Sequence, residues 1–199
     1  GGMTVIWLAG VKMKYFAYLS VIFLSTAPIA ISFLKPYQKA RILTFLNPSR
    51  DPLGAGYQIT QSKIAIGSGG LFGKGFLNGS QSYLDYLPEK HTDFIFTLFS
   101  EEFGFFGSIS ILFLYAVITW RIVSIGHMVR DSFRKLYCYS FATAFFIYVV
   151  VNMSMVLGLI PIVGAPLPIL SYGGSSMMAI MLGLGIVMSC KIHKDQSIG

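Results

Sequence analysis

Charged residues are scarce in this sequence. Only 12% of its 199 residues are charged, and only eight of them are acidic. A soluble domain carries about twice that charged fraction. In contrast, 54% of the residues are hydrophobic, and the mean hydropathy is +0.68. This composition excludes an ordinary soluble globular domain and is typical of an integral membrane protein.

Cysteine is also scarce. The two cysteines, Cys138 and Cys190, lie about fifty residues apart, with no CxxC pair and no histidine at a ligand spacing. Neither a disulfide framework nor a zinc site is indicated. The net charge of +7 is carried by segments between apolar runs. We expect membrane lipids, and no nucleic acid, among the partners of this chain.

Four apolar stretches approach the roughly 20 residues that cross a bilayer. They are residues 15–34, with a kink at Pro28, then 94–120, 136–160 and the shorter 176–190. Residues 1–11 are uncharged but too short to span, so we expect a truncated helix there. The sequence predicts an all-α, polytopic transmembrane bundle: about four full spans, a truncated one and a long loop at 35–93. Residues 1–199 would be the C-terminal part of one integral membrane domain.

Lysine and arginine orient these spans. The short segments 12–14, 121–135 and 191–194 all carry them, and the alternation of spans places all three on one side. Basic short loops face the cytoplasm. The loop at 35–93 and the Gly- and Pro-rich segment at 158–176 are then expected on the periplasmic or extracellular face.

A polar stretch runs directly into an apolar one at residues 87–96, LPEKHTDFIF. Because Pro88 forbids a helix through itself, we expect a helix from Phe94 onward, with Thr92 and Asp93 at its N-terminus. Asp93 has two interpretations. It could cap the helix, a role worth about 1 kcal/mol. It could instead be a general base, which the neighbouring titratable residues favour; these neighbours are Glu89, Lys90 and His91.

Basic residues and glycines fill the rest of the long loop. Lys63, Lys74 and Lys90 are either solvated surface charges or a binding surface for an anionic headgroup such as a diphosphate. The stretch from Gly67 to Gly75, GSGGLFGKG, fails both glycine-rich nucleotide motifs on spacing, with Ser68 where the first glycine of a phosphate loop should stand. It remains compatible with phosphate binding through free N–H groups or with a tight turn.

Polar residues interrupt the apolar sequence at two further places. Glu101 and Glu102 lie eight and nine residues beyond Asp93, which on a continuous helix is roughly 12 Å or more. They either pair within the bundle or have a function. The segment 161–176, which contains Ser171 and Tyr172, could re-enter the membrane and line the same cavity as Asp93, or could form a plain turn.

Five stretches, in this order, resemble the SEDS family (shape, elongation, division and sporulation). They are GYQ at 56–58, QSKIAIGSGGLFGKG at 61–75, LPEKHTDFIF at 87–96, EEFG at 101–104 and PLPILSYGGSS at 166–176. The forms at Lys63 and Lys74 are more similar to elongation members than to division members. The resemblance implies a bundle of ten transmembrane helices in a bacterial inner (plasma) membrane. It also implies that Asp93 is the catalytic residue.

The resemblance further implies an inverting glycosyltransferase that polymerises lipid II, with a class B penicillin-binding protein as partner. Asp93 would take the proton of the attacking hydroxyl. The leaving diphosphate would be stabilised by Lys63, Lys74, Lys90 or a divalent cation, with no metal site assigned. The other candidate substrate contacts are Ser68, Glu89, His91, Thr92, Glu101, Ser171 and Tyr172. The alternatives are a lipid II flippase, which predicts functional acids near the midplane, and a scaffold that activates the penicillin-binding protein.

Overall fold

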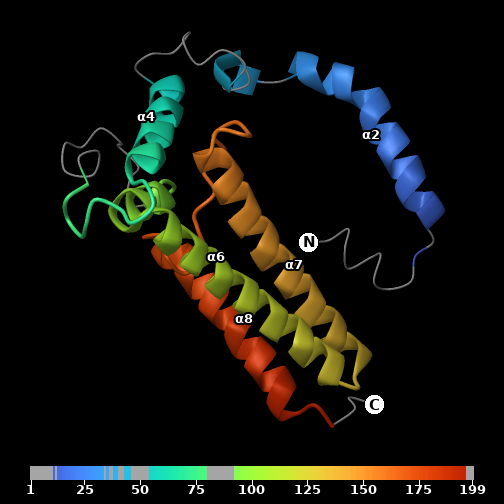
Figure 1. Cartoon of the computed structure of the whole chain (residues 1–199). Helices are drawn as coiled ribbons and strands as arrows, with labels where there is room; N and C mark the ends of the chain where they lie inside the picture. The colour runs from blue at the N-terminus through green and yellow to red at the C-terminus, as the bar shows by residue number, and fades with distance from the viewer. Residues whose placement is uncertain are drawn as a thin grey trace.

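The described part of the protein is helical. In this computed structural model the described residues are 11, 13–33, 35, 38–39, 43–45, 54–79 and 92–195. They form α2 (Met13–Phe33), α4 (Ala55–Ser68), α6 (Ile95–Met128), α7 (Ser132–Val156) and α8 (Gly174–Ile192) (Figure 1). No strand occurs within these ranges. The prediction of an all-α membrane protein is confirmed, because α6, α7 and α8 are each long and apolar enough to cross a bilayer.

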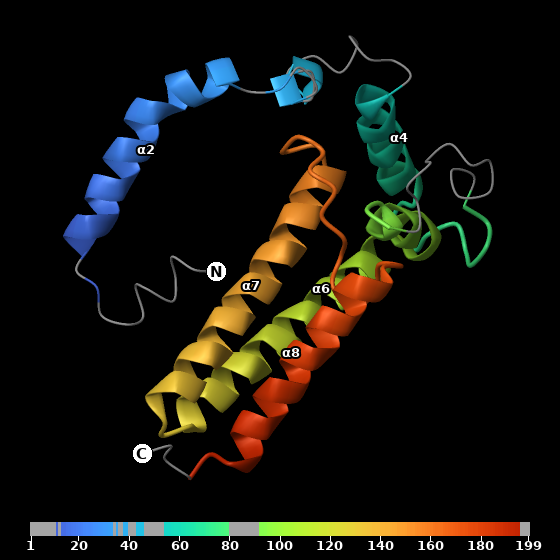
Figure 2. The same cartoon turned by 180° about the vertical axis from the view of Figure 1, so that it is seen from behind.

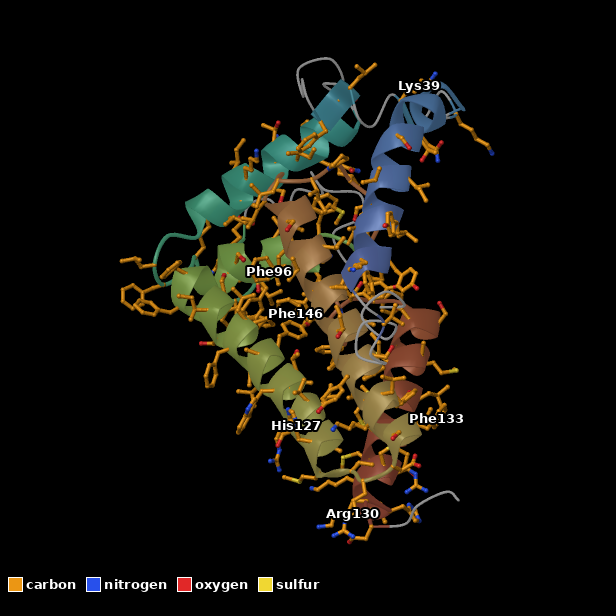
Figure 3. All side chains as sticks on the ribbon, turned by 90° about the vertical axis from the view of Figure 1, so that its right-hand side faces the viewer. Lys39, Phe96, His127, Arg130, Phe133 and Phe146 are labelled. Carbon is orange, nitrogen blue, oxygen red and sulfur yellow. The ribbon has the colours of Figure 1, made fainter. Side chains whose placement is uncertain are left out.

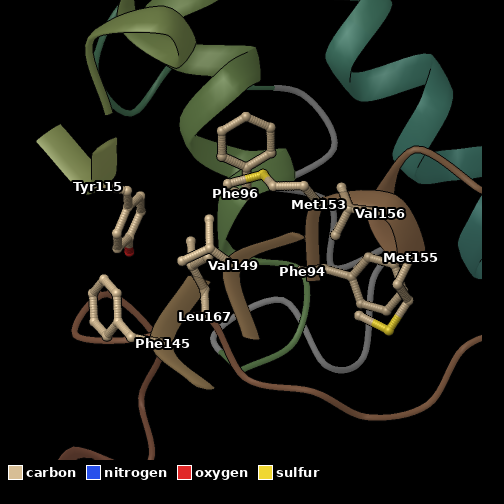
Figure 4. Packing of buried hydrophobic residues seen from close by; sticks show 9 residues of the cluster. All are labelled: Phe94, Phe96, Tyr115, Phe145, Val149, Met153, Met155, Val156 and Leu167. Carbon is tan, nitrogen blue, oxygen red and sulfur yellow. The ribbon is translucent and has the colours of Figure 1, made fainter. Parts of the chain in front are cut away.

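The three helices α6, α7 and α8 lie side by side, and α4 lies near one end of this bundle (Figures 1 and 2). Helix α2, which occupies the first predicted span, stands apart from the bundle in both views. Two apolar cores hold the bundle together. One surrounds Phe94, Phe145 and Met155 near α4 (Figure 4), and the other surrounds Ile122, Cys138 and Val187 near the opposite end.

The two ends of the bundle differ in charge. The connection between α6 and α7 lies beside the end of α8, because Arg134 donates a hydrogen bond to the His193 carbonyl and Arg130 N–H donates to that of Lys194. We call this the basic end; Figure 3 labels His127, Arg130 and Phe133 there. The opposite end, where α6 begins, is called the Asp93 end. Two of the basic segments therefore share one end of the bundle, as predicted.

The loop predicted at 121–135 is largely helical. Helix α6 continues past Trp120 and Arg121 to Met128, and α7 begins at Ser132. No proline interrupts residues 121–128, and the single Gly126 is tolerated within a helix, so α6 continues beyond the apolar stretch. Asp131 caps α7 by accepting a hydrogen bond from the Arg134 N–H.

Helix α6 is broken near its start, where the sequence predicted one continuous span. Gly104 has φ 67° and ψ −160°, a conformation that only glycine adopts readily. The break would leave two N–H groups, of Phe105 and Phe106, and two carbonyls, of Glu101 and Glu102, without their helical partners. Both glutamates precede the break, so they lie on the short helical segment between Asp93 and Gly104 and not on the long segment that follows it.

The glycine-rich loop replaces the lost hydrogen bonds. Phe105 N–H donates to the Gly70 carbonyl and Phe106 N–H to that of Leu71, while Lys74 and Gly75 donate to the carbonyls of Glu101 and Glu102. The approach is so close that a Cβ on Gly73 or Gly104 would collide with the facing backbone. The Gly73 N–H also donates, to the Gly69 carbonyl. The interpretation that the N–H groups of this loop are free to bind phosphate is therefore wrong for residues 73 to 75.

Candidate functional site

Asp93 lies one residue before the N-cap of α6. The N-cap position falls on Phe94, whose carbonyl accepts from Thr97 N–H at 2.9 Å and Leu98 N–H at 3.5 Å. Asp93 is half-buried, and it precedes the position that the capping interpretation assigned to it. The helical hydrogen bonds therefore begin after Asp93, and other groups must hold its backbone.

Two buried side chains hold that backbone. The Asn152 amide, from α7, donates to the Asp93 carbonyl at 2.9 Å, and the Ser171 hydroxyl donates to the Thr92 carbonyl at 2.7 Å. Asn152 is fully buried, and Ser171 is 5% exposed. Ser171, a predicted substrate contact, thus binds the backbone beside Asp93.

The loop between α7 and α8 folds back into the bundle and is not a plain exit turn. Leu167 is 1% exposed, and the Tyr115 hydroxyl donates to the Pro168 carbonyl at 2.5 Å. On the same loop, a Cβ placed on Gly164 would lie 3.4 Å from Oδ2 of Asp93. The loop therefore packs against the helices and passes beside the Asp93 carboxylate.

An open cavity lies next to this loop. Its volume is about 480 Å³, and it is lined by Ile95, Ile169, Leu170, Ser171, Tyr172 and Met177. Ile95 follows Asp93 by only two residues. Tyr172, another predicted contact, is 84% exposed. The cavity therefore offers space for part of a ligand between the start of α6 and the start of α8.

Lys74 and Glu101 form an ion pair. Lys74 Nζ lies 2.6 Å from Glu101 Oε1, and the Glu101 side chain is fully buried whereas 30% of the Lys74 side chain is exposed. Ser68, which contacts Glu101 at 3.5 Å, donates mainly to the Ala65 carbonyl at 2.8 Å. Of the two interpretations of Glu101, the structure supports pairing within the bundle, where it joins the glycine-rich loop to α6.

Lys63 differs from Lys74. It lies on the exposed side of α4, and its side chain crosses the end of α7, where a Cβ on Gly158 would lie 2.8 Å from Lys63 Nζ. Within the described ranges the Lys63 ammonium makes no ion pair. It therefore remains available for an anion, whereas Lys74 already neutralises a buried carboxylate.

Three predicted site residues, Glu89, Lys90 and His91, lie outside the described residues. Asn152 was not among the predicted site residues. A lone asparagine in the apolar run VVVNMSM nevertheless indicates a buried polar contact, because amides inside membrane spans require partners. Among the residues that the structure describes, no three His, Cys, Asp or Glu side chains are close enough to share a metal ion.

The fold and this site define a class: multi-pass helical membrane proteins with a carboxylate held at the head of a broken helix, beside a loop that packs into the bundle. Residues 1–196 match the model of the FtsW/RodA/SpoVE family, described as cell cycle proteins. The chain belongs to this family, which confirms the resemblance to SEDS proteins.

Curated relatives agree with this assignment. The chain is 45% identical to peptidoglycan glycosyltransferase MrdB of Escherichia coli K12 over 194 residues, which cover 97% of this chain and 52% of that protein. It is 47% identical to peptidoglycan glycosyltransferase RodA of Treponema pallidum over 161 residues, or 81% of this chain and 37% of the relative. The chain thus spans about half the length, or less, of these relatives.

A solved structure is also similar. One chain of a peptidoglycan synthase complex, studied for the coordination of polymerization and crosslinking, matches with a TM-score of 0.73 and 31% identity. The match covers 96% of this chain and 53% of that one. The helical arrangement described above is therefore similar to that of about half of a chain in this complex.

Proposed function

We propose that the protein is an inverting glycosyltransferase that polymerises lipid II at the outer leaflet, during cell elongation. The observation that carries this proposal is the position of Asp93: its backbone is held by Asn152 and Ser171, and it lies beside an open cavity at the end of the bundle away from the basic loops. The names of the curated relatives support the same activity.

Asp93 acts as the general base in this proposal. It accepts the proton of the acceptor's GlcNAc 4-hydroxyl while that oxygen attacks the anomeric carbon of the donor's MurNAc, and undecaprenyl diphosphate leaves. A positioned base of this kind contributes typically 10²- to 10⁴-fold. We assign the diphosphate contact to Lys63 rather than Lys74, since only Lys74 is paired with a buried acid. A divalent cation could share this role.

The proposal extends to location and partner. The basic end would face the cytoplasm of a bacterium, and the Asp93 end the periplasmic or extracellular side. A class B penicillin-binding protein would supply the crosslinking activity, in line with the synthase complex to which the chain is similar. The flippase alternative is less favoured, because Glu101 is engaged by Lys74 and lies before the break in α6.

Replacing Asp93 by Asn tests the proposal directly. Asparagine keeps the size of the side chain but cannot accept the proton, so glycan polymerisation from lipid II should fall at least roughly 100-fold while thermal unfolding stays unchanged. The assay uses purified protein with its penicillin-binding partner. Polymerisation at the parental rate would refute the base assignment. If the parent moves labelled lipid II between vesicle leaflets without forming polymer, the flippase alternative is correct.

A further inference from the structure

Each of the two peptide groups that flank the Cα of Asp93 is bound by a buried side chain. The Thr92 carbonyl, in the peptide group before Asp93, accepts from Ser171 Oγ at 2.7 Å. The Asp93 carbonyl, in the peptide group after it, accepts from Asn152 Nδ2 at 2.9 Å. Both donors come from parts of the chain that follow Asp93 by 59 residues or more.

Holding both peptide groups restrains the direction of the Cα–Cβ bond of Asp93. A peptide group is planar, so the orientations of the two planes on either side of a Cα define its φ and ψ. These angles set the direction of the Cα–Cβ bond. Helix α6 cannot impose them, because its hydrogen bonds begin at the Phe94 carbonyl.

The same amide also holds the loop that faces the carboxylate. Asn152 Nδ2 donates a second hydrogen bond, to the Ala165 carbonyl at 2.6 Å, next to Gly164. Its Oδ1 is buried and accepts no hydrogen bond from the described residues. Within the described residues, the hydrogen bonds of this amide are therefore made by its NH₂ group, which links the Asp93 backbone to the loop beside the Asp93 carboxylate.

This loop is held in a strained conformation. Ile169 has φ 69°, which costs a β-branched residue about 1–3 kcal/mol. The contacts on either side keep it there: Tyr115 binds the Pro168 carbonyl, and Ser171 binds Thr92. A conformation that its neighbours maintain against strain is a common feature of functional sites.

We infer that Asn152 and Ser171 are positioning residues for Asp93. They orient its carboxylate toward the reacting hydroxyl without touching the substrate, and Ser171 is reassigned from substrate contact to this role. The inference rests on the proposed function, since it concerns the base of that reaction. Displacing a catalytic group by about 1 Å can cost roughly 100-fold in rate, which sets the scale of the expected effect.

The test compares Ser171→Ala and Asn152→Leu with a matched control, Ser62→Ala. The Ser62 hydroxyl is equally buried and donates to the Val156 carbonyl at 2.8 Å, but it does not bind the Asp93 backbone. The readouts are thermal unfolding, together with kcat and KM for lipid II polymerisation by purified protein and its partner. Ser171→Ala and Asn152→Leu should lower kcat roughly 10- to 100-fold with little change in KM.

Ser62→Ala should unfold at a lower temperature yet keep kcat within about twofold of the parent. Ser171→Thr retains the hydroxyl and should restore most of the kcat lost in Ser171→Ala. If Asn152→Leu does not fold, the comparison of Ser171→Ala with Ser171→Thr tests the inference by itself. A kcat for Ser171→Ala equal to that of Ser62→Ala would overturn the inference, and so would a loss confined to KM, which indicates a substrate contact.

Asp93→Asn, measured alongside, separates the two proposals. If it is inactive while Ser171→Ala matches the Ser62→Ala control, the positioning role fails and the proposed base remains. If Asp93→Asn polymerises normally, the base assignment fails, and the positioning role falls with it.

Discussion

The two ends of the bundle are held together in different ways. At the basic end, apolar side chains such as Ile122, Cys138 and Val187 pack helix against helix, and the hydrogen bond from the Arg134 side chain to the His193 carbonyl is exposed. At the Asp93 end, an apolar core is also present, but buried polar side chains bind carbonyls across it, namely Ser62, Tyr115, Asn152 and Ser171. Packing is sufficient where regular helices meet. Loop backbone inside a membrane protein needs specific donors.

This difference indicates where function resides. A buried hydrogen bond to a loop carbonyl fixes backbone in one conformation, whereas apolar contacts tolerate small shifts. The protein uses such bonds around Asp93 and in the loop facing it. At the Asp93 end we therefore expect that a substitution can lower activity without lowering stability, or the reverse. Substitutions in the core of the basic end should lower stability alone.

The largest effect on stability is expected from Lys74→Gln. This change removes the Lys74 ammonium from the buried Glu101 carboxylate, and removing one partner of a buried pair costs about 3–5 kcal/mol. Because Lys74 is partly exposed, we expect about 3 kcal/mol, measured by denaturant unfolding in detergent. Adding Glu101→Gln should recover most of the loss. A single variant within about 0.5 kcal/mol of the parent would show that water already solvates the carboxylate.

Lys63→Gln should instead lower activity with little change in stability. Its ammonium makes no ion pair in the described part of the chain, so the free energy of unfolding should change by less than about 1 kcal/mol. If Lys63 binds the diphosphate, kcat/KM for lipid II should fall roughly 10- to 100-fold, because charge-assisted hydrogen bonds contribute about 1.5–3 kcal/mol. Lys135→Gln at the basic end is the control. An activity within about twofold of the parent would remove Lys63 from the site.

Much of this architecture follows from the sequence. Hydropathy located α6, α7 and α8, because a bilayer demands long apolar helices whatever their neighbours are. The motif at 87–96 placed Asp93 before a helix. The break at Gly104 was not predicted, since a lone glycine in a helical pattern is usually tolerated.

What was overlooked depends on distant parts of the chain. The break in α6 is stable only because residues 70 to 75 supply the missing hydrogen bonds. In the sequence, Asn152 is a single amide within an apolar helix, and no neighbouring residue indicates that it binds the carbonyls of Asp93 and Ala165. Pairings between residues so far apart are set by tertiary structure, which periodicity along one helix does not contain.

Tyr115→Phe should produce a smaller loss. It removes one of two donors to the Pro168 carbonyl while keeping the aromatic ring in the core, because the Leu170 N–H also donates to this carbonyl at 2.8 Å. A typical hydrogen bond contributes about 0.5–1.5 kcal/mol, and we expect a loss of roughly 1.5 kcal/mol by denaturant unfolding. Tyr139→Phe, whose hydroxyl contacts the exposed His127, is the control and should change stability by less than about 0.5 kcal/mol. Equal losses in the two variants would contradict the contrast between the ends.

The smallest effect is expected from Ile122→Val at the basic end. Ile122 is 3% exposed and packs in the apolar core there, so removing one methylene group should cost about 1 kcal/mol. The rate of polymerisation should not change, because no buried hydrogen bond connects this core to the Asp93 backbone in the described residues. A fall in kcat of about tenfold, with the protein still folded, would show that the two ends are mechanically coupled. Apolar packing alone would then transmit position along α6, and the division between a stabilising end and a functional end would be wrong.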